Sequence, residues 1–244
     1  MITTSAHLAE LRKRLIVSFG AIFLFAGLSY IFAEQIARFF MAPLFHASPT
    51  LLKLIYTNLT EAFITYLKLS LLMGVIFSIP VLIYQLWMFI AAGLYTHERK
   101  YVQIAVPFST VLFVTGALFF LFFVAPWTLR FFILFNQRAL GVNSNFTFSD
   151  YISFITMLML IFGIAFQTPI AIFILTRTGL VSIQNFTRSR KFVIVGIFII
   201  SAIVTPPDVV SQVTLAIPLY ALFELGILLS WLAERKRKKA LPVT

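Results

Sequence analysis

Long uncharged runs alternate along the chain with short clusters of charged residues, and this alternation predicts a series of membrane crossings. The first run, Leu15 to Ala33, has 19 residues. As a helix it would rise about 28 Å, against a hydrocarbon core of about 30 Å. Runs of 29, 29 and 26 residues follow between Lys68 and Glu98, Lys100 and Arg130, and Asp150 and Arg177. Each is long enough for one tilted helix.

Two shorter runs complete the pattern: 16 residues between Lys191 and Asp208, and the 15 residues Val209 to Phe223. A helix of 16 residues rises only about 24 Å, so these spans would thin the bilayer or tilt the bundle. Prolines inside the runs either curve the helices for packing or help helices of unequal length to form a concave wall. They are Pro80, Pro107, Pro169 and Pro218.

The pattern therefore predicts an all-α integral membrane protein, with residues 1–244 as a single membrane domain. The expected spans are approximately 15–33, 69–94, 102–125, 151–175, 192–205 and 210–231, with a cytoplasmic tail at 232–244. Composition agrees, because 61% hydrophobic and only 11% charged residues exceed what the core of a water-soluble domain can hide.

The formal charge of +11 reports orientation rather than nucleic-acid binding, because the basic residues lie in the breaks between apolar runs. With six crossings, 14 of the 19 basic residues fall on the side of the two termini and five on the other side. Positive charge is retained on the cytoplasmic side. Both termini are therefore expected in the cytoplasm.

The residues offer little chemistry for catalysis. The chain has no cysteine, and its three histidines are scattered without metal-ligand spacing. There is also no GxSxG motif and no glycine-rich phosphate loop. We expect no enzyme activity, no catalytic residue, no metal and no cofactor.

Polar side chains within the spans need partners, because an unpaired amide in lipid is costly. Gln167 lies 16 positions after Tyr151, about 24 Å into the fourth span. We expect it to face the interior of the bundle. For Glu224 and Lys68 the residues alone favour an interfacial, snorkelling or locally paired position.

Four motifs in order along the chain resemble the family of TatC, the polytopic subunit of the twin-arginine protein translocase. The first is HLAELRKRL at residues 7–15, and the second is PVLIYQLWMFI from Pro80, followed by GLY at 93–95 and HER at 97–99. The third is TPPDV at 205–209, and the fourth is AIP at 216–218 with Phe223 and Glu224. Together they extend from residue 7 to about 226.

The resemblance implies a cupped bundle of six transmembrane helices that recognises signal peptides carrying paired arginines. Glu10 and Glu98 would hold those arginines, and Phe89, Leu8 and Arg12 would belong to the same surface. The residues alone favour a simpler interpretation, in which Glu10 forms an exposed pair with Arg14 at i,i+4 and Glu98 pairs with its basic neighbours.

The resemblance also implies partners. Thr205 and Gln212 would dock single-span subunits of the TatA and TatB type, whereas the residues alone also allow both to cap helix ends. The family exports folded proteins with the proton-motive force, and we expect a homo-oligomer within a larger complex in a bacterial plasma membrane rather than a plastid thylakoid.

Two departures from the family pattern concern Gln167, where many members have glutamate, and Ala92, where proline is common. The alternative function is a six-helix secondary transporter of a small solute. That function would require a charged or helix-broken site at the midplane, whereas the deep spans carry mostly neutral side chains.

Overall fold

The computed structural model is helical, and it describes residues 4–47, 54–55, 58–92, 99–140, 147–204 and 209–240. In this part of the chain the one β-type pairing is an isolated bridge between Ile55 and Thr147. The contacts divide the chain into two compact units, Met1–Leu160 and Ile161–Thr244.

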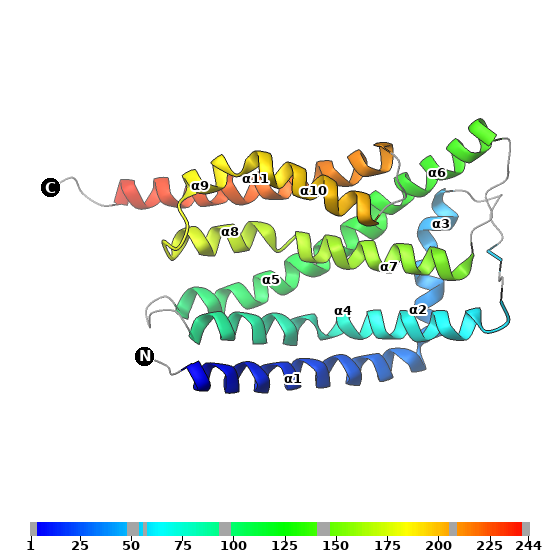
Figure 1. Cartoon of the computed structure of the whole chain (residues 1–244), viewed down its shortest axis with the longest axis horizontal. Helices are drawn as coiled ribbons and strands as arrows, with labels where there is room; N and C mark the ends of the chain where they lie inside the picture. Colours follow the sequence, from blue (N-terminus) through cyan, green and yellow to red (C-terminus); the bar gives the residue numbers. More distant parts are fainter. Residues whose placement is uncertain are drawn as a thin grey trace. The chain divides into compact units, whose positions relative to one another are not determined.

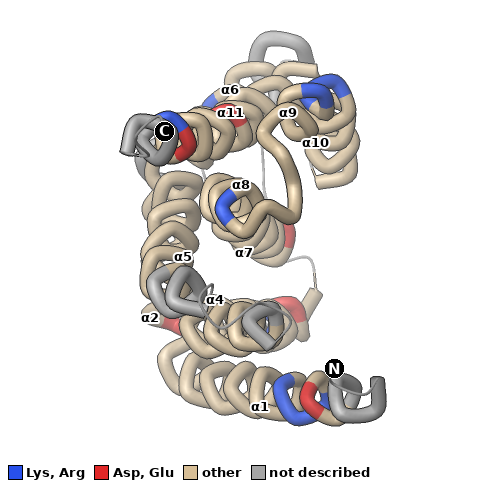
Figure 2. The backbone as a smooth tube through the Cα atoms, turned by 90° about the vertical axis from the view of Figure 1, so that its left-hand side faces the viewer, with Lys and Arg blue, Asp and Glu red and all other residues tan. Residues whose placement is uncertain are grey.

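The first unit is built on three long helices that run side by side (Figures 1 and 2). They are α1 (Thr4–Ile31), α4 (Glu61–Ala92) and α5 (Arg99–Phe119), with α4 in contact with both of the others. Two short helices follow α1: α2 (Ala33–Phe40) and α3 (Ala42–Ala47). A π-helical turn, η1 (Phe120–Val124), joins α5 to α6 (Ala125–Leu140), and α7 (Phe148–Ala165) begins in this unit.

Small residues set the distance between α1 and α4. A Cβ added to Gly74 of α4 would lie 2.7 Å from the Cβ and the backbone nitrogen of Ala26 in α1. Without a driving force from water, membrane helices associate by close packing of this kind. Between α4 and α5 a polar contact is added, because the indole Nε1 of Trp87 donates to Oγ of Ser109 at 3.0 Å.

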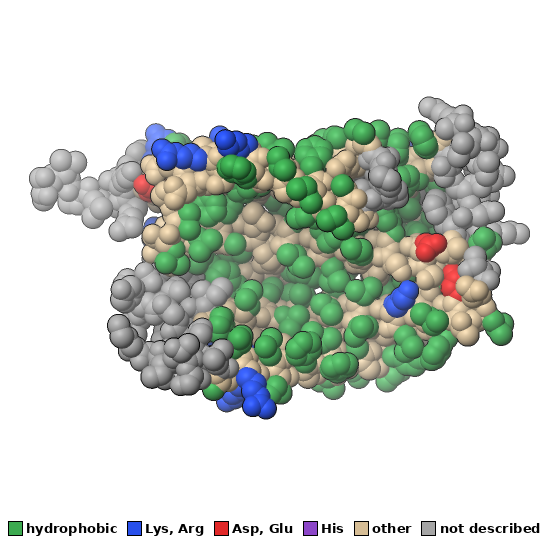
Figure 3. Space-filling view, viewed as in Figure 1, with side chains coloured by type: hydrophobic (Ala, Val, Ile, Leu, Met, Phe, Trp, Pro, Cys, Tyr) green, Lys and Arg blue, Asp and Glu red, His purple; other side chains and the backbone are tan. Residues whose placement is uncertain are grey.

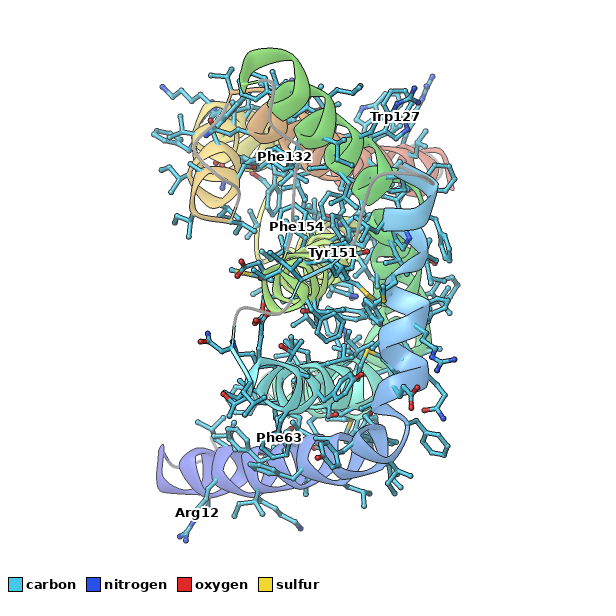
Figure 4. The ribbon with its side chains drawn as sticks, turned by 90° about the vertical axis from the view of Figure 1, so that its right-hand side faces the viewer. Arg12, Phe63, Trp127, Phe132, Tyr151 and Phe154 are labelled. Atoms are coloured by element: carbon cyan, nitrogen blue, oxygen red, sulfur yellow. The ribbon has the colours of Figure 1, made fainter. Side chains whose placement is uncertain are left out.

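A carboxylate and a phenol tie the beginnings of α4 and α7 into the first unit. Oε1 of Glu61 accepts the backbone N–H of Ser149 at 3.1 Å, although Glu61 is itself buried. The hydroxyl of Tyr151 donates to the carbonyl of Phe40 at 2.6 Å. Figure 4 shows Phe132 of α6 and Phe154 of α7 pointing toward one another, with ring centroids 6.3 Å apart.

The second unit packs four helices that follow the end of α7. They are α8 (Thr168–Arg177), α9 (Ile183–Arg188), α10 (Arg190–Val204) and α11 (Val209–Ala240), and α11 contacts each of the others. Its buried cluster is formed by Ile172, Phe223 and Ile227. After α8 the chain turns at Gly179, whose φ of +73° favours glycine.

The prolines have different local effects. The helix is broken between α7 and α8 just before Pro169, which occupies the first turn of α8 and needs no backbone donor there. In contrast, Pro80, Pro107 and Pro218 lie inside continuous helices. Charged residues do not mark the break before Pro169, so the uncharged run from Asp150 to Arg177 is predicted as one helix.

Five helical segments of the described chain are long and apolar enough to cross a membrane. They are Ala9–Ile31, Glu61–Phe89, Ala105–Phe135, Phe148–Arg177 and Gln212–Arg235. Large apolar side chains cover much of the visible surface, as lipid contact requires (Figure 3). The prediction of an all-α membrane protein is confirmed by these findings.

The helices extend beyond the predicted spans, since α4 begins at Glu61 rather than near residue 69 and α11 continues to Ala240. A charged residue such as Lys68 interrupts an apolar run, but the helix continues through it. The predicted fifth span is the 15-residue α10, which rises about 22 Å and is shorter than a typical span. Six crossings and cytoplasmic termini therefore stay predictions.

Candidate functional site

Glu10 lies in the first part of α1, where its carboxylate is held by Arg14 one turn further on. Oε1 of Glu10 accepts from Nη2 of Arg14 at 2.5 Å and from Nε at 3.1 Å. The i,i+4 spacing brings the two side chains to the same face of the helix. Glu10 keeps 30% of its side chain exposed, and Arg14 keeps 18%.

Arg14 also reaches a second helix. Its Nη1 donates to Oε1 of Gln85 in α4 at 3.1 Å, so one guanidinium bridges a carboxylate of α1 and an amide of α4. We call these three residues the α1–α4 clasp: Glu10, Arg14 and Gln85. Within the part of the chain that is described, both bonds to Glu10 use Oε1, and Oε2 accepts none. The clasp therefore orients a carboxylate that retains acceptor capacity.

The simple alternative for Glu10, an exposed pair with Arg14, is only part of what is found. The i,i+4 pair forms, but Arg14 is mostly buried and has a second partner 71 residues away. A matched pair on α2, Glu34 with Arg38, shows what an isolated pair looks like: the side chains are 62% and 77% exposed. The Glu10 pair is thus better shielded from water than an ordinary surface ion pair.

The other residues predicted for this surface lie as follows. Phe89 is half-buried on α4, one turn beyond Gln85 and so on the same face. Arg12 is exposed and points away from α4 (Figure 4). Leu8 is within α1, but its side chain is outside the described part, and Glu98 lies outside the described residues altogether.

Sequence reasoning did not assign a role to Gln85. The sequence did contain a sign of such a role. The stretch from Pro80 to Phe89 is apolar except for the phenol of Tyr84 and the amide of Gln85. An amide at such a position needs a hydrogen-bond partner. Its partner, Arg14, is too distant in sequence to be recognised from the pattern.

Of the two residues predicted to dock partner helices, one is described. Gln212 lies in the first turn of α11, and its Nε2 donates to the carbonyl of Phe198 in α10 at 2.8 Å. It connects two helices rather than capping its own. Thr205 lies outside the described residues.

Polar residues deeper in the second unit also have partners. Gln167 precedes Thr168 at the start of α8, in the break after α7, and is partly buried. Glu224 accepts from Arg190 at 2.7 Å and from the hydroxyl of Tyr220 at 2.7 Å. The expectation that Glu224 is locally paired is confirmed, whereas the role of Gln167 stays a prediction.

Among the described residues, no three histidine, cysteine or acidic side chains lie close enough together to hold a metal ion. What this end of the first unit offers is a clustered set of charges. Figure 2 shows acidic and basic residues side by side at the start of α1. An oriented carboxylate in such a cluster can accept hydrogen bonds from a cationic group.

Comparison with known proteins identifies the family. The family model "Sec-independent protein translocase protein (TatC)" matches residues 6–218. The protein of that name from Escherichia coli K12 is 40% identical over 225 residues, covering 92% of this chain and 86% of that protein. The one from Aquifex aeolicus is 38% identical over 233 residues, covering 96% of both.

Solved structures agree. The crystal structure of the "Twin Arginine Translocase Receptor- TatC" superimposes with a TM-score of 0.84 at 38% identity and covers 93% of this chain and 99% of that one. A second crystal structure of the same receptor in DDM gives a TM-score of 0.85 at 37% identity, covering 92% and 99%. The chain belongs to the TatC family of the Sec-independent protein translocase, whose members are multi-pass membrane components of protein transport and not enzymes.

Proposed function

We propose that this protein is the receptor for twin-arginine signal peptides and the scaffold on which the translocase assembles. Its site would be the surface around the α1–α4 clasp, with Glu10 and Glu98 as acceptors for the two arginines. The observation that carries the proposal is the position of Glu10, whose side chain is 30% exposed and is oriented by Arg14, which Gln85 holds in turn.

The electrostatics of Glu10 suit a guanidinium guest. A carboxylate that has used only one oxygen can accept a second cation through the other. Arginine presents a planar fork of donors, and such charge-assisted bonds are strongest where water is partly excluded. Lysine has a compact ammonium and cannot match that fork, so the site should prefer arginine.

The distribution of basic residues supports a cytoplasmic position for this surface. Fourteen of the 19 basic residues fall on the side of the termini when the chain crosses six times. The positive-inside rule then puts the beginning of α1 and the loop containing Glu98 on the cytoplasmic side of a bacterial inner membrane. Signal peptides of folded cargo would meet the site there before crossing.

Recruitment of partners is the second part of the proposed function. Thr205 and Gln212 would dock single-span subunits of the TatA and TatB type within a homo-oligomeric complex that exports cargo with the proton-motive force. The bond to Phe198 uses one of the two amide donors of Gln212, so a partner would use the second donor or the side-chain oxygen. The alternative, a solute transporter, is not favoured, because the chain belongs to a protein-transport family.

The deciding experiment measures binding of a fluorescent peptide with an Arg-Arg pair, and of its Lys-Lys variant, to the detergent-purified protein. Glu10→Gln and Glu98→Gln should each weaken Arg-Arg binding by about tenfold, the effect of one charge-assisted bond. The matched control is Glu34→Gln, which removes a carboxylate from an i,i+4 pair of the same kind.

Several results would count against the receptor. Equal affinity for the Arg-Arg and Lys-Lys peptides, or no binding to the folded protein, contradicts it. So does an equal effect of Glu34→Gln and Glu10→Gln. For partner docking, crosslinks to the single-span subunits should fall in the Thr205→Ala, Gln212→Ala double variant, and unchanged crosslinks would remove that assignment.

A further inference from the structure

A pocket of about 700 Å³ lies in the second unit between α9 and the C-terminal part of α11. Helix α9 contributes Gln184, Thr187 and Arg188 to its lining, and α11 contributes Trp231, Glu234 and Arg235. Basic side chains gather at this end of the unit, near α9 and the end of α11 (Figure 3). The pocket is unrelated to the clasp, which belongs to the first unit.

Two guanidinium groups give the pocket its chemistry. Arg188 is exposed and has no ion-pair partner among the described residues. Arg235 lies over the ring of Trp231, 5.3 Å from its centroid, so the aromatic face orients it. The single carboxylate of the lining, Glu234, is engaged by another group. Two arginines with amide and hydroxyl donors beside them favour an anionic group such as phosphate over a neutral ligand.

The position along α11 indicates where that phosphate would come from. The apolar part of α11 gives way to charged residues at Glu234 and Arg235, within the pocket lining. Trp231 is 46% exposed, and tryptophan is enriched at the level of lipid headgroups. On either side of it along the chain, Leu228 and Leu232 are 50% and 42% exposed and offer an apolar surface to acyl chains. A charged pocket therefore opens where an apolar helix surface ends.

A neighbouring cavity supplies an independent observation. It has a volume of about 250 Å³ and shares Ile183, Gln184 and Glu234 with the first. Ser230 lines it with a hydroxyl that is buried and has no hydrogen-bond partner within the described chain. An unpaired buried hydroxyl is costly, which indicates that a polar guest or water completes it.

We propose that the pocket between α9 and α11 binds the phosphate of an anionic phospholipid headgroup. Arg188 and Arg235 hold the phosphate oxygens, and Gln184 and Thr187 add donors. The proposal does not rest on receptor function, because it concerns other residues and a different ligand.

The test titrates the detergent-purified full chain with phosphatidylglycerol and counts bound lipids by native mass spectrometry. Phosphatidylcholine with the same acyl chains and inorganic phosphate are the comparison ligands. The Arg188→Gln, Arg235→Gln variant should bind phosphatidylglycerol more weakly by about fivefold for each arginine removed. A charge-matched control is Arg38→Gln, Arg130→Gln, which alters exposed arginines of the first unit and should leave the affinity unchanged.

Two results would contradict the proposed site. An equal loss of phosphatidylglycerol affinity in both double variants would mean that only net charge matters. Equal affinity for phosphatidylglycerol and phosphatidylcholine would contradict the site as well. Displacement of the lipid by millimolar inorganic phosphate would overturn the lipid as occupant. The Arg188→Lys, Arg235→Lys variant should retain part of the affinity, because charge persists without the planar fork.

A second measurement needs no substitution. Hydrogen exchange of the unaltered protein should slow at residues 183–188 and 231–235 when phosphatidylglycerol is added, and not with phosphatidylcholine. Protection confined to other segments would contradict the assignment even if the glutamine variant failed to fold.

Discussion

Gly74 of α4 lies against Ala26 of α1 so closely that no side chain fits between the two helices. The Cβ of an alanine at position 74 would approach the Cβ, the backbone nitrogen and the Cα of Ala26 to 2.7, 2.7 and 2.8 Å. Two of these atoms belong to the backbone, which cannot rotate away. The contact therefore determines how near α1 can come to α4, and with it how Arg14 reaches Gln85.

Gly74→Ala should accordingly lower stability by about 1–3 kcal/mol, as overpacking does. The matched control is Gly27→Ala, where a Cβ would meet nothing within 4 Å and the better helix propensity of alanine should leave stability equal or higher. Thermal unfolding of both variants in the same detergent measures the difference. Equal melting temperatures would show that α1 moves away freely.

Gln85→Leu should detach Arg14 from α4. One charge-assisted bond is lost, which is worth about 1.5–3 kcal/mol, and part of that appears as lower stability of the first unit. If Glu10 binds the signal peptide, the Arg-Arg peptide should also bind several-fold more weakly, because the carboxylate loses its orientation. Gln85→Glu retains an acceptor for Arg14 and should behave more like the unaltered protein. A peptide affinity unaffected by Gln85→Leu would mean that the clasp supports only the fold.

Glu61→Ala should loosen the beginnings of α4 and α7 together. The substitution leaves the N–H of Ser149 without its acceptor in a partly buried place, at a cost of about 1–3 kcal/mol. Hydrogen exchange at the Ser149 amide should then accelerate. Asp150→Ala, an exposed carboxylate in the same turn, is the control and should leave that amide protected.

Tyr151→Phe removes the hydroxyl that donates to the carbonyl of Phe40. Tyr151 is 2% exposed, so water cannot replace the bond, and we expect a loss of about 1 kcal/mol. Tyr30→Phe changes a tyrosine that is 43% exposed and should have little effect. Denaturant titration of the two variants provides the comparison, and equal midpoints would contradict the assigned bond.

The pair of Arg190 and Glu224 should be weakly coupled. Both side chains are partly exposed, at 44% and 32%, so solvent screening limits the coupling to about 0.5–1 kcal/mol. A double-mutant cycle with Arg190→Gln and Glu224→Gln measures it, and the coupling should fall with added salt. A large coupling that salt does not change would indicate that the pair is shielded from solvent in the membrane.

The apolar runs of the sequence were sufficient to predict the helices. Uncharged runs of membrane length predicted an all-α membrane protein, and four motifs in order along the chain indicated its family. These features are local: they depend on neighbouring residues, so they can be read along the chain. Helix ends were less accurate, because α4 continues to Glu61 past the charge of Lys68, and α8 begins anew before Pro169.

Only the tertiary structure determined which side chains bond to one another across neighbouring helices. The sequence determined that Glu10 and Arg14 share a face, but not that Arg14 would also bond Gln85, or that Gln212 would bond the carbonyl of Phe198. Such contacts depend on how far each helix is rotated and how closely it crosses its neighbour, which packing at positions such as Gly74 determines. An apolar pattern that continues around the whole helix leaves that rotation undetermined, since lipid accepts any apolar face.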